Sequence, residues 1–309
     1  MNSLIKQVAS GSESSNSILI QDTVEHSGRH ILRCFIKEIA KRVDEVHLFA
    51  FDRTPDALLA GSDPETRLKV TCHDGWTDPQ GWNQASMTLC KHNLVRFTSD
   101  KDLIDHVVDT RRKESKVLAV VIDSLTPHIV HRTVPVTCRA LHSLTHLPDK
   151  SDFQVQQVLS LLHRDVHDEA ALRAIGHLSM TVISVSPNMS IAPLDAAPMG
   201  FCDILHKRSS GKVLRKREGY SICDDYRLLT FVDVQKTAER MEEEHQLDPT
   251  ANLTFNLTLK DSERKAKENV VLPFTKVAEN ASRGSGQIFY EPDQADDYDD
   301  EDPDDDLDI

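Results

Sequence analysis

Apolar stretches alternate along the chain with amphipathic ones, and this alternation predicts strands followed by helices. A run of six apolar residues, Val117–Ile122 (V-L-A-V-V-I), leads into Asp123 and Ser124. An unbroken Val/Ile/Leu run is typical of a strand that is buried on both faces, as central parallel strands are. The polar pair at its carboxyl end lies where α/β sheets bind their ligands.

Segments before and after this run extend the pattern to a whole domain. Strands are predicted at 17–21, 43–51, 68–73, 155–162 and 178–185, and helices at 29–42, 100–113, 136–147 and 169–177. Since strands alternate with helices, this order predicts an α/β fold with a mostly parallel sheet flanked by helices. Three later segments, 203–207, 211–217 and 228–234, predict a late antiparallel hairpin and a third strand.

Polar ends frame this domain, which we place at residues 17–235. Residues 1–16 are polar and Ser-rich, and they are predicted to be a flexible N-terminus. After residue 235 the chain becomes highly charged, with short apolar islands at 253–259, 270–274 and 287–290. We expect residues 236–309 to form an extended tail with short docking segments and a disordered acidic end, because this composition buries too little apolar surface.

The net charge of −14 belongs almost entirely to that end. Twelve acidic residues and no basic one lie between Glu291 and the last residue, so the rest of the chain carries only −2. No apolar run approaches the roughly 18 residues of a membrane span, and no membrane partner is expected. The N-terminus lacks the apolar core of a secretory signal, and the six cysteines never pair as C-x-x-C. We therefore expect reduced thiols and a protein of the cytoplasm and nucleus.

The loop after the first predicted strand is where a P-loop, G-x-x-x-x-G-K-[ST], would lie. Residues 23–30 read T-V-E-H-S-G-R-H, so Thr23 replaces the first glycine and Gly28 matches the second. Arg29 stands for the lysine, and His30 replaces the hydroxyl that binds magnesium. Because the metal ligand and the first glycine are lost, the loop is not expected to hydrolyse ATP.

Asp123 then has two interpretations. It is either a remnant of a magnesium-binding aspartate or an aspartate that ends its strand and caps a helix beginning near Leu125. We favour the second, because no other part of a magnesium site accompanies it.

Other catalytic and metal-binding patterns are incomplete. His163-Arg164-Asp165 matches the H-R-D of protein kinases, but the glycine-rich loop and D-F-G are missing. His142/His146 and His163/His167 have the i, i+4 spacing of helical metal ligands, but no third ligand is fixed nearby. We predict no catalytic residue, no metal and no other cofactor, and therefore a protein that is not an enzyme.

A basic cluster marks the predicted hairpin. Its six cations are Lys207, Arg208, Lys212, Arg215, Lys216 and Arg217. Such a cluster can follow a phosphate backbone, with Tyr220 stacked on a base, and this would make it a tRNA contact. Lysines also protect exposed edge strands against aggregation. The sequence leaves both interpretations open.

The most specific pattern is the C-terminal tail. It reads L-T-F-N-L at 253–257, V-L-P-F at 271–274, I-F-Y-E-P-D at 288–293 and D-D-Y-D-D-E-D-P-D-D-D-L-D-I at 296–309. This order closely resembles the carboxyl terminus of the Elongator complex subunit 5 family. The helix start at Gly28-Arg29 and V-I-D-S-L at 121–125 agree with the resemblance, which covers essentially the whole chain.

The resemblance implies a RecA-like fold without a functional P-loop. Members of the family form a hetero-hexameric ring with Elongator subunits 4 and 6, two copies of each. The ring associates with tRNA and supports modification of the tRNA wobble uridine (U34), while catalysis lies in another subunit. We therefore expect a non-catalytic structural subunit whose partners are subunits 4 and 6, the catalytic subcomplex and tRNA. The alternative is a divergent nucleotide-binding regulatory protein that does not hydrolyse ATP.

The resemblance also gives the apolar islands of the tail a role. Short apolar islands in a polar segment suit the addition of an extended strand to the sheet of a partner. We expect the tail to dock on a partner subunit through five residues: Leu253, Phe255, Leu257, Leu272 and Phe274. The acidic end is either a solubilising tail or a mimic of nucleic acid that occupies basic surfaces.

Overall fold

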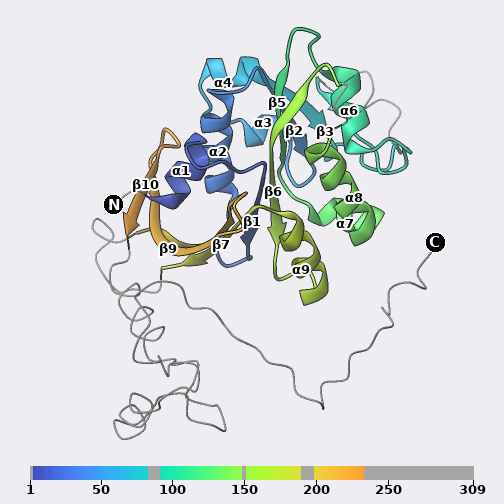
Figure 1. The fold of residues 1–309 in the computed structure, drawn as a ribbon. Helices are drawn as coiled ribbons and strands as arrows, with labels where there is room; N and C mark the ends of the chain where they lie inside the picture. Colours follow the sequence, from blue (N-terminus) through green and yellow to red (C-terminus); the bar gives the residue numbers. More distant parts are fainter. Residues whose placement is uncertain (1–2, 83–90, 148–150, 189–197, 233–309) are drawn as a thin grey trace, which may run out of the picture. The chain divides into compact units, whose positions relative to one another are not determined.

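The computed structural model describes residues 3–82, 91–147, 151–188 and 198–232, which Figure 1 shows as coloured ribbon. These residues form a ten-stranded sheet in the order β10-β9-β8-β7-β1-β6-β5-β2-β3-β4. The strands are β1 (Ser17–Asp22), β2 (Glu45–Ala50), β3 (Val70–Asp74), β4 (Asn93–Leu94), β5 (Val117–Ile122), β6 (Gln154–His163), β7 (Thr181–Pro187), β8 (Gly200–Lys207), β9 (Val213–Ile222) and β10 (Leu228–Val232).

The sheet is parallel from β7 across to β4 and antiparallel from β7 to β10. Strand β1 lies inside the sheet, between β6 and β7. This is the mostly parallel α/β sheet that was expected. The late antiparallel hairpin and its third strand are confirmed as β8, β9 and β10.

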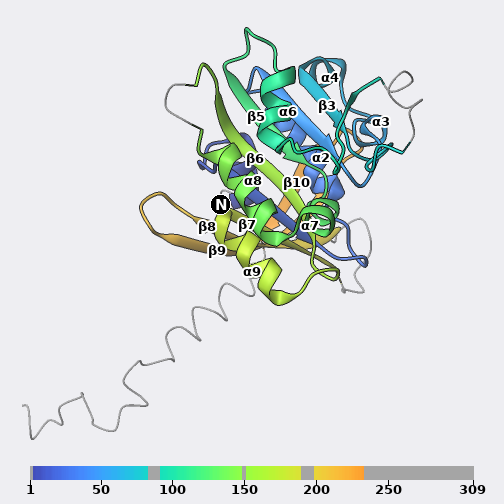
Figure 2. The same ribbon diagram turned by 90° about the vertical axis from the view of Figure 1, so that its right-hand side faces the viewer.

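Helices cover both faces of the parallel part (Figure 2). They are α1 (Leu4–Ser10), α2 (Arg29–Ala40), α3 (Pro55–Leu58), α4 (Pro64–Lys69), α6 (Leu103–Thr110), α7 (Thr126–Arg132), α8 (Val134–Thr145) and α9 (Glu169–Leu178). Apolar residues of α1, α2 and α3 fill the core on one face, and those of α6, α7, α8 and α9 fill the core on the other. Strand β5 contributes side chains to both cores, which confirms that it is buried on both faces.

The short helices α3 and α4 were not predicted, and the strand expected at 68–73 begins at Val70 because α4 precedes it. Both helices start with a capping residue followed by proline. Thr54 accepts a hydrogen bond from the amide of Ala57, and Asp63 accepts one from the amide of Thr66. A T-P or D-P pair is a recognised helix start, so local sequence carried this signal.

The N-terminal prediction was wrong. Residues 4–10 form α1, whose side chains of Leu4, Ile5 and Val8 are at most 1% exposed. The helix is fixed by Glu218 on β9, whose carboxylate accepts hydrogen bonds from Ser3 Oγ at 2.7 Å and from the amides of Leu4 and Ile5 at 2.6 and 3.3 Å. A buried carboxylate from a strand more than 200 positions away thus caps the start of this helix.

Replacing Glu218 with alanine is expected to lower the free energy of unfolding by about 2 to 4 kcal/mol, because the buried amides of Leu4 and Ile5 lose their acceptor. Urea unfolding measures this change, and limited proteolysis should show earlier cleavage within residues 3–16. Glu114→Gln removes an exposed carboxylate and serves as the control, with an expected change below about 0.5 kcal/mol. Equal stability of the two variants would contradict this role for Glu218.

Candidate functional site at the carboxyl edge of the sheet

The loop between β1 and α2 lies where a P-loop would, and the carboxylate of Asp22 binds one of its backbone amides. Asp22 ends β1 and is 1% exposed. Its Oδ2 accepts the amide hydrogen of Gly28 at 2.8 Å. In a P-loop the backbone amides of this turn bind phosphate oxygens. Here that amide is already bonded, and the charge beside it is negative, so the loop is unsuited to a triphosphate.

Asp22 also joins two neighbouring parallel strands at their ends. Its Oδ1 accepts a hydrogen bond at 2.6 Å from Nδ1 of His163, the residue opposite it on β6. This hydrogen bond raises the pKa of His163 above its usual value. Asp22 was not among the predicted site residues, although an aspartate at the end of the first predicted strand was a visible signal. His163 was considered there only as part of a kinase-like triplet.

The remainder of the loop is closed on itself. The backbone groups of Thr23 and His26 form an antiparallel bridge. Nε2 of His26 lies 2.6 Å from the hydroxyl of Tyr220 on β9. Gly28 is required by close approach, because a Cβ at this position would lie 2.7 Å from Cγ2 of Ile20. These contacts hold the turn to itself, to β1 and to β9.

Arg29, which stands for the P-loop lysine, is engaged by another carboxylate. Its guanidinium forms an ion pair with Asp52, just after β2, and both side chains are 28% exposed. A nucleotide would have to displace Asp52 to use this cation. The geometry therefore opposes the alternative of a nucleotide-binding protein that relies on Arg29.

Asp123 lies at the end of its strand, as predicted. It does not cap the helix that begins near Leu125, but binds the chain after β2. Its buried carboxylate accepts the amide hydrogens of Phe51, Asp52 and Arg53 at 2.7, 3.0 and 3.1 Å. It therefore fixes the chain after β2, while the amide of Thr126 at the start of α7 is bonded to Ser124 Oγ. Burial raises the pKa of Asp123 to about 7, although the three amide donors oppose this shift. A carboxylate engaged in this way has little capacity left for magnesium.

The histidines considered as metal ligands make other contacts. His163 is bonded to Asp22, and Nε2 of His167 lies 2.9 Å from Thr126 Oγ1. The rings of His142 and His146 stack on each other on α8. Within the described ranges, no group of three or more His, Cys, Asp or Glu side chains is arranged to hold a metal ion.

Three of the six hairpin cations contact other groups of the described domain. Lys207 Nζ donates to three backbone oxygens at the end of α9, and Arg208 forms a double hydrogen bond with Glu13 at 2.7 and 2.8 Å. Arg217 lies over the ring of Phe201, 4.9 Å from its centroid, and 3.5 Å from Asp203.

The other three cations, Lys212, Arg215 and Lys216, are exposed on the hairpin. Tyr220 is 2% exposed, so the base stacking suggested for it is wrong. The edge-strand interpretation stays open, because β10 pairs only with residues 218–222 of β9, and among the described strands residues 213–217 pair with β8 alone. No described side chain forms an ion pair with these three cations, and the prediction that they contact phosphates stands. The predicted docking residues Leu253, Phe255, Leu257, Leu272 and Phe274 lie outside the described residues.

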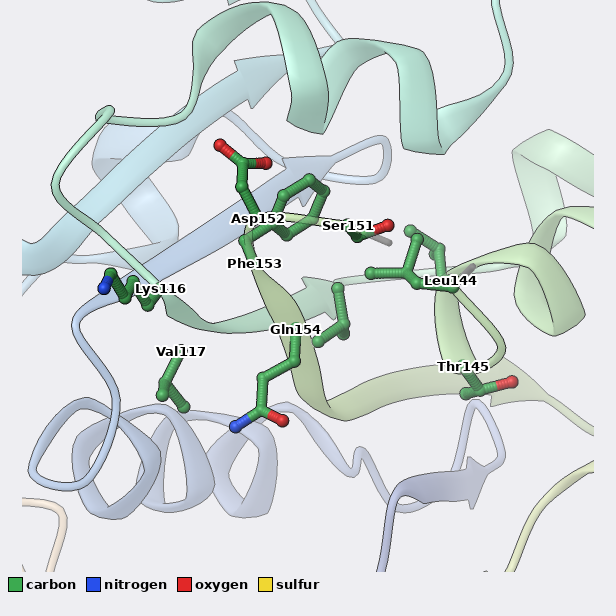
Figure 3. Close-up of a pocket in the computed structure, with 10 residues that line it drawn as sticks. Lys116, Val117, Leu144, Thr145, Ser151, Asp152, Phe153 and Gln154 are labelled. Atoms are coloured by element: carbon green, nitrogen blue, oxygen red, sulfur yellow. The ribbon is translucent and has the colours of Figure 1, made fainter. Parts of the chain in front are cut away.

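A hollow of about 500 Å³ lies at the opposite edge of the sheet, around the start of β5 and β6 (Figure 3). Lys116, Thr145, Asp152 and Gln154 line it together with the apolar side chains of Leu144 and Phe153. It is separated from Asp22, His163 and Asp123, which stand at the carboxyl ends of their strands. No helix of the described segments is long and apolar enough to cross a membrane.

Two kinds of comparison relate this chain to known proteins. Its sequence matches the family described as Elongator subunit Iki1 over residues 4–198 and 194–291. Elongator complex protein 5 of Danio rerio is 35% identical over 315 residues, which cover 99% of this chain and 100% of that protein. The proteins of the same name from Mus musculus and Homo sapiens are 30% and 27% identical over 306 residues, covering 94% of this chain and 96% of each.

Among solved structures, an uncharacterized protein of Pyrococcus horikoshii is similar with a TM-score of 0.48 and 14% identity, over 70% of this chain and 92% of that one. The flagellar accessory protein FlaH of Methanocaldococcus jannaschii gives 0.45 and 10%, over 74% and 95%. The sequence matches carry the assignment, because they span nearly the full length of this chain and of its relatives. The chain therefore belongs to the Elongator subunit Iki1 family and is a subunit of the Elongator complex.

Proposed function

We propose that this chain is a non-catalytic structural subunit that forms a hetero-hexameric RecA-like ring with Elongator subunits 4 and 6. The ring supports modification of the wobble uridine (U34) of tRNA, for which the catalytic subcomplex supplies the chemistry. The chain acts in the cytoplasm and nucleus. Family membership supports the complex, and one observation supports the non-catalytic role: the carboxylate of Asp22 occupies the amide of Gly28 where a phosphate would bind.

Two measurements test this function. The tagged chain should copurify with Elongator subunits 4 and 6 from cells in equal amounts, and loss of the chain should lower wobble-uridine modification in total tRNA. Complementation with the wild-type chain should restore the modification. Failure of subunits 4 and 6 to copurify would overturn the assembly role, and unchanged modification would overturn the role in tRNA.

The nucleotide-binding alternative has its own test. Equilibrium binding of labelled ATP to the full chain is expected to be weaker than millimolar, because Asp22 and Asp52 place two carboxylates at the loop. Micromolar binding that Arg29→Ala abolishes would favour the alternative. ATP binding that Arg29→Ala does not change would show that the nucleotide binds outside the loop between β1 and α2.

A contact between the free hairpin cations and tRNA predicts a specific salt dependence. Changing Lys212, Arg215 and Lys216 together to glutamate should weaken tRNA binding by the ring about 10- to 100-fold. The slope of log affinity against log salt should fall by about two to three, roughly one per lost phosphate contact.

The matched control changes Lys6, Arg53 and Lys113 to glutamate, since these exposed cations give the same change in net charge elsewhere on the domain. Binding measured by fluorescence anisotropy should change less than threefold in this control. Equal losses in both triple variants would show that only total charge matters, and the hairpin would then not be a tRNA contact.

A further inference from the structure

The two outer strands of the sheet differ in how well they are protected. Strand β4 has two residues, and such short strands are one way in which proteins blunt a sheet edge. Strand β10 has five residues, L-L-T-F-V, with no charged side chain and no proline. It pairs with β9 on one side, and no other described strand pairs with its second side. Proteins rarely expose such an edge without a use for it.

The edge is held rigidly by the turn that precedes it. Tyr226 has a φ of 56°, as expected at the left-handed position of a three-residue hairpin loop. Its hydroxyl is hydrogen-bonded to Arg33 on α2 and donates to the backbone oxygen of Ala60 at 3.3 Å. Lys37, also on α2, donates to the backbone oxygen of Asp225 at 2.6 Å. A partner strand would therefore meet a preformed edge and would pay little ordering entropy.

The hydrogen-bond pattern tells which backbone groups are free. The amide of Cys223 donates to the oxygen of Arg227 at 3.1 Å, so this pair is a hydrogen-bonded one. Bonded and non-bonded pairs alternate in an antiparallel ladder. Leu229 and Phe231 therefore bond to β9, opposite Ser221 and Gly219. The amides and carbonyls of Leu228, Thr230 and Val232 point to the outer edge.

An apolar strip lies beside this edge. Leu229 and Phe231 lie on one face of β10 and are 40% and 41% exposed. Met199, the residue before β8, is 51% exposed. A Cβ on Gly219 would lie 3.0 Å from Pro198 and 3.3 Å from Phe231, which places Pro198 beside Phe231 on that face. Successive side chains of a strand point to opposite faces of the sheet. Every second side chain of an added strand would therefore lie on the same face as Leu229 and Phe231 and pack beside them.

We propose that β10 is an assembly strand whose free edge accepts an extended, uncharged segment of a neighbouring Elongator subunit. The added strand bonds to the backbone of Leu228, Thr230 and Val232, and its alternate apolar side chains pack beside Leu229 and Phe231. Strand β10 has no charged side chain with which a charged segment could pair, so the edge matches an uncharged one. The inference rests on the proposed assembly with other subunits and specifies one of its contacts.

Amide hydrogen exchange at residue resolution tests this contact directly. In the isolated full-length chain, the amides of Leu228, Thr230 and Val232 should exchange freely, while those of Leu229 and Phe231 should be protected by β9. In the complex copurified with subunits 4 and 6, all five should be protected, with exchange at the three outer amides slowed at least tenfold. Unchanged exchange at these three amides in the complex would overturn the proposal.

Two other occupants are separate outcomes. Protection of the outer amides in the isolated chain at every concentration would assign the edge to the chain's own tail. Protection that rises with concentration, together with a dimer in sedimentation, would assign it to a second copy. Either result would overturn the proposal of a neighbouring Elongator subunit.

A matched pair of variants tests the backbone requirement. Thr230→Pro removes an outward amide without removing a bond to β9, and it should lower the amount of copurified partner at least tenfold. Thr230→Val keeps that amide and the β-branched shape, so copurification should stay within twofold of wild type. Thermal unfolding of both variants checks that β10 remains folded. Undiminished copurification with Thr230→Pro would show that β10 does not accept a partner strand. The proposed assembly with other Elongator subunits would then still stand.

Discussion

Replacing Asp123 with alanine is expected to lower the free energy of unfolding by about 3 to 5 kcal/mol. The buried amide of Phe51 and the partly buried amides of Asp52 and Arg53 lose their common acceptor. Each buried donor left without a partner costs about 1 to 3 kcal/mol, and partial rehydration of the exposed turn reduces the sum. Urea unfolding monitored by circular dichroism measures the change.

Two further variants separate this effect from a simple loss of charge. Asp123→Asn keeps one acceptor oxygen and should cost about 1 to 2 kcal/mol. Asp224→Ala removes an exposed aspartate from the turn before β10 and should change stability by less than about 0.5 kcal/mol. A cost for Asp123→Ala as small as that for Asp224→Ala would contradict the role of Asp123 in holding the chain after β2.

The raised pKa of Asp123 gives this stability a pH dependence. A folded pKa of about 7, against about 3.9 in the unfolded chain, means that the folded state binds the proton more tightly. The contribution is complete below about pH 4 and is lost as pH rises toward 7, by up to about 4 kcal/mol. The stability of wild type relative to Asp123→Asn should therefore fall as the pH rises from about 4 to about 7. A difference that is constant over this range would contradict the raised pKa.

Deleting residues 249–309 is expected to abolish copurification with the ring partners while the domain still folds. The described domain ends with β10 at Val232, and the described buried residues of its two cores lie between Leu4 and Tyr220. The apolar islands of that part suit strand addition to a partner, and their loss removes this contact. Affinity purification from cells measures the partners, and thermal unfolding measures the domain.

Point substitutions refine this test. Changing Leu253, Phe255 and Leu257 to serine should reproduce the loss of partners, because the apolar face of one island is removed. Deleting only residues 291–309 removes the twelve acidic residues and leaves the islands in place, so copurification should persist. Unchanged copurification after the longer deletion would show that the tail does not dock on these partners.

Much of the fold followed from local pattern. The six-residue run of β5, the amphipathic stripe of α2 and the three late antiparallel strands each carry their periodicity within a few residues. The defects of residues 23–30 as a P-loop were also local, because the motif is defined by residue type at fixed spacing. The error at residues 1–16 arose because α1 has seven residues, too few for a periodic signal, and owes its stability to a distant carboxylate.

The sequence by itself determined the succession of strands and helices, the departure of residues 23–30 from the P-loop motif and the family. Only the tertiary structure decided which polar groups meet: Asp22 with Gly28 and His163, Glu218 with the start of α1, and Asp123 with the chain after β2. It also decided that Tyr220 is buried and that β10 is the outer strand beside residues 218–222 of β9. The reason is physical: periodicity reports burial along one element, whereas these contacts join elements up to 215 positions apart. Their partners are set by the order of strands in the sheet, which no local pattern contains.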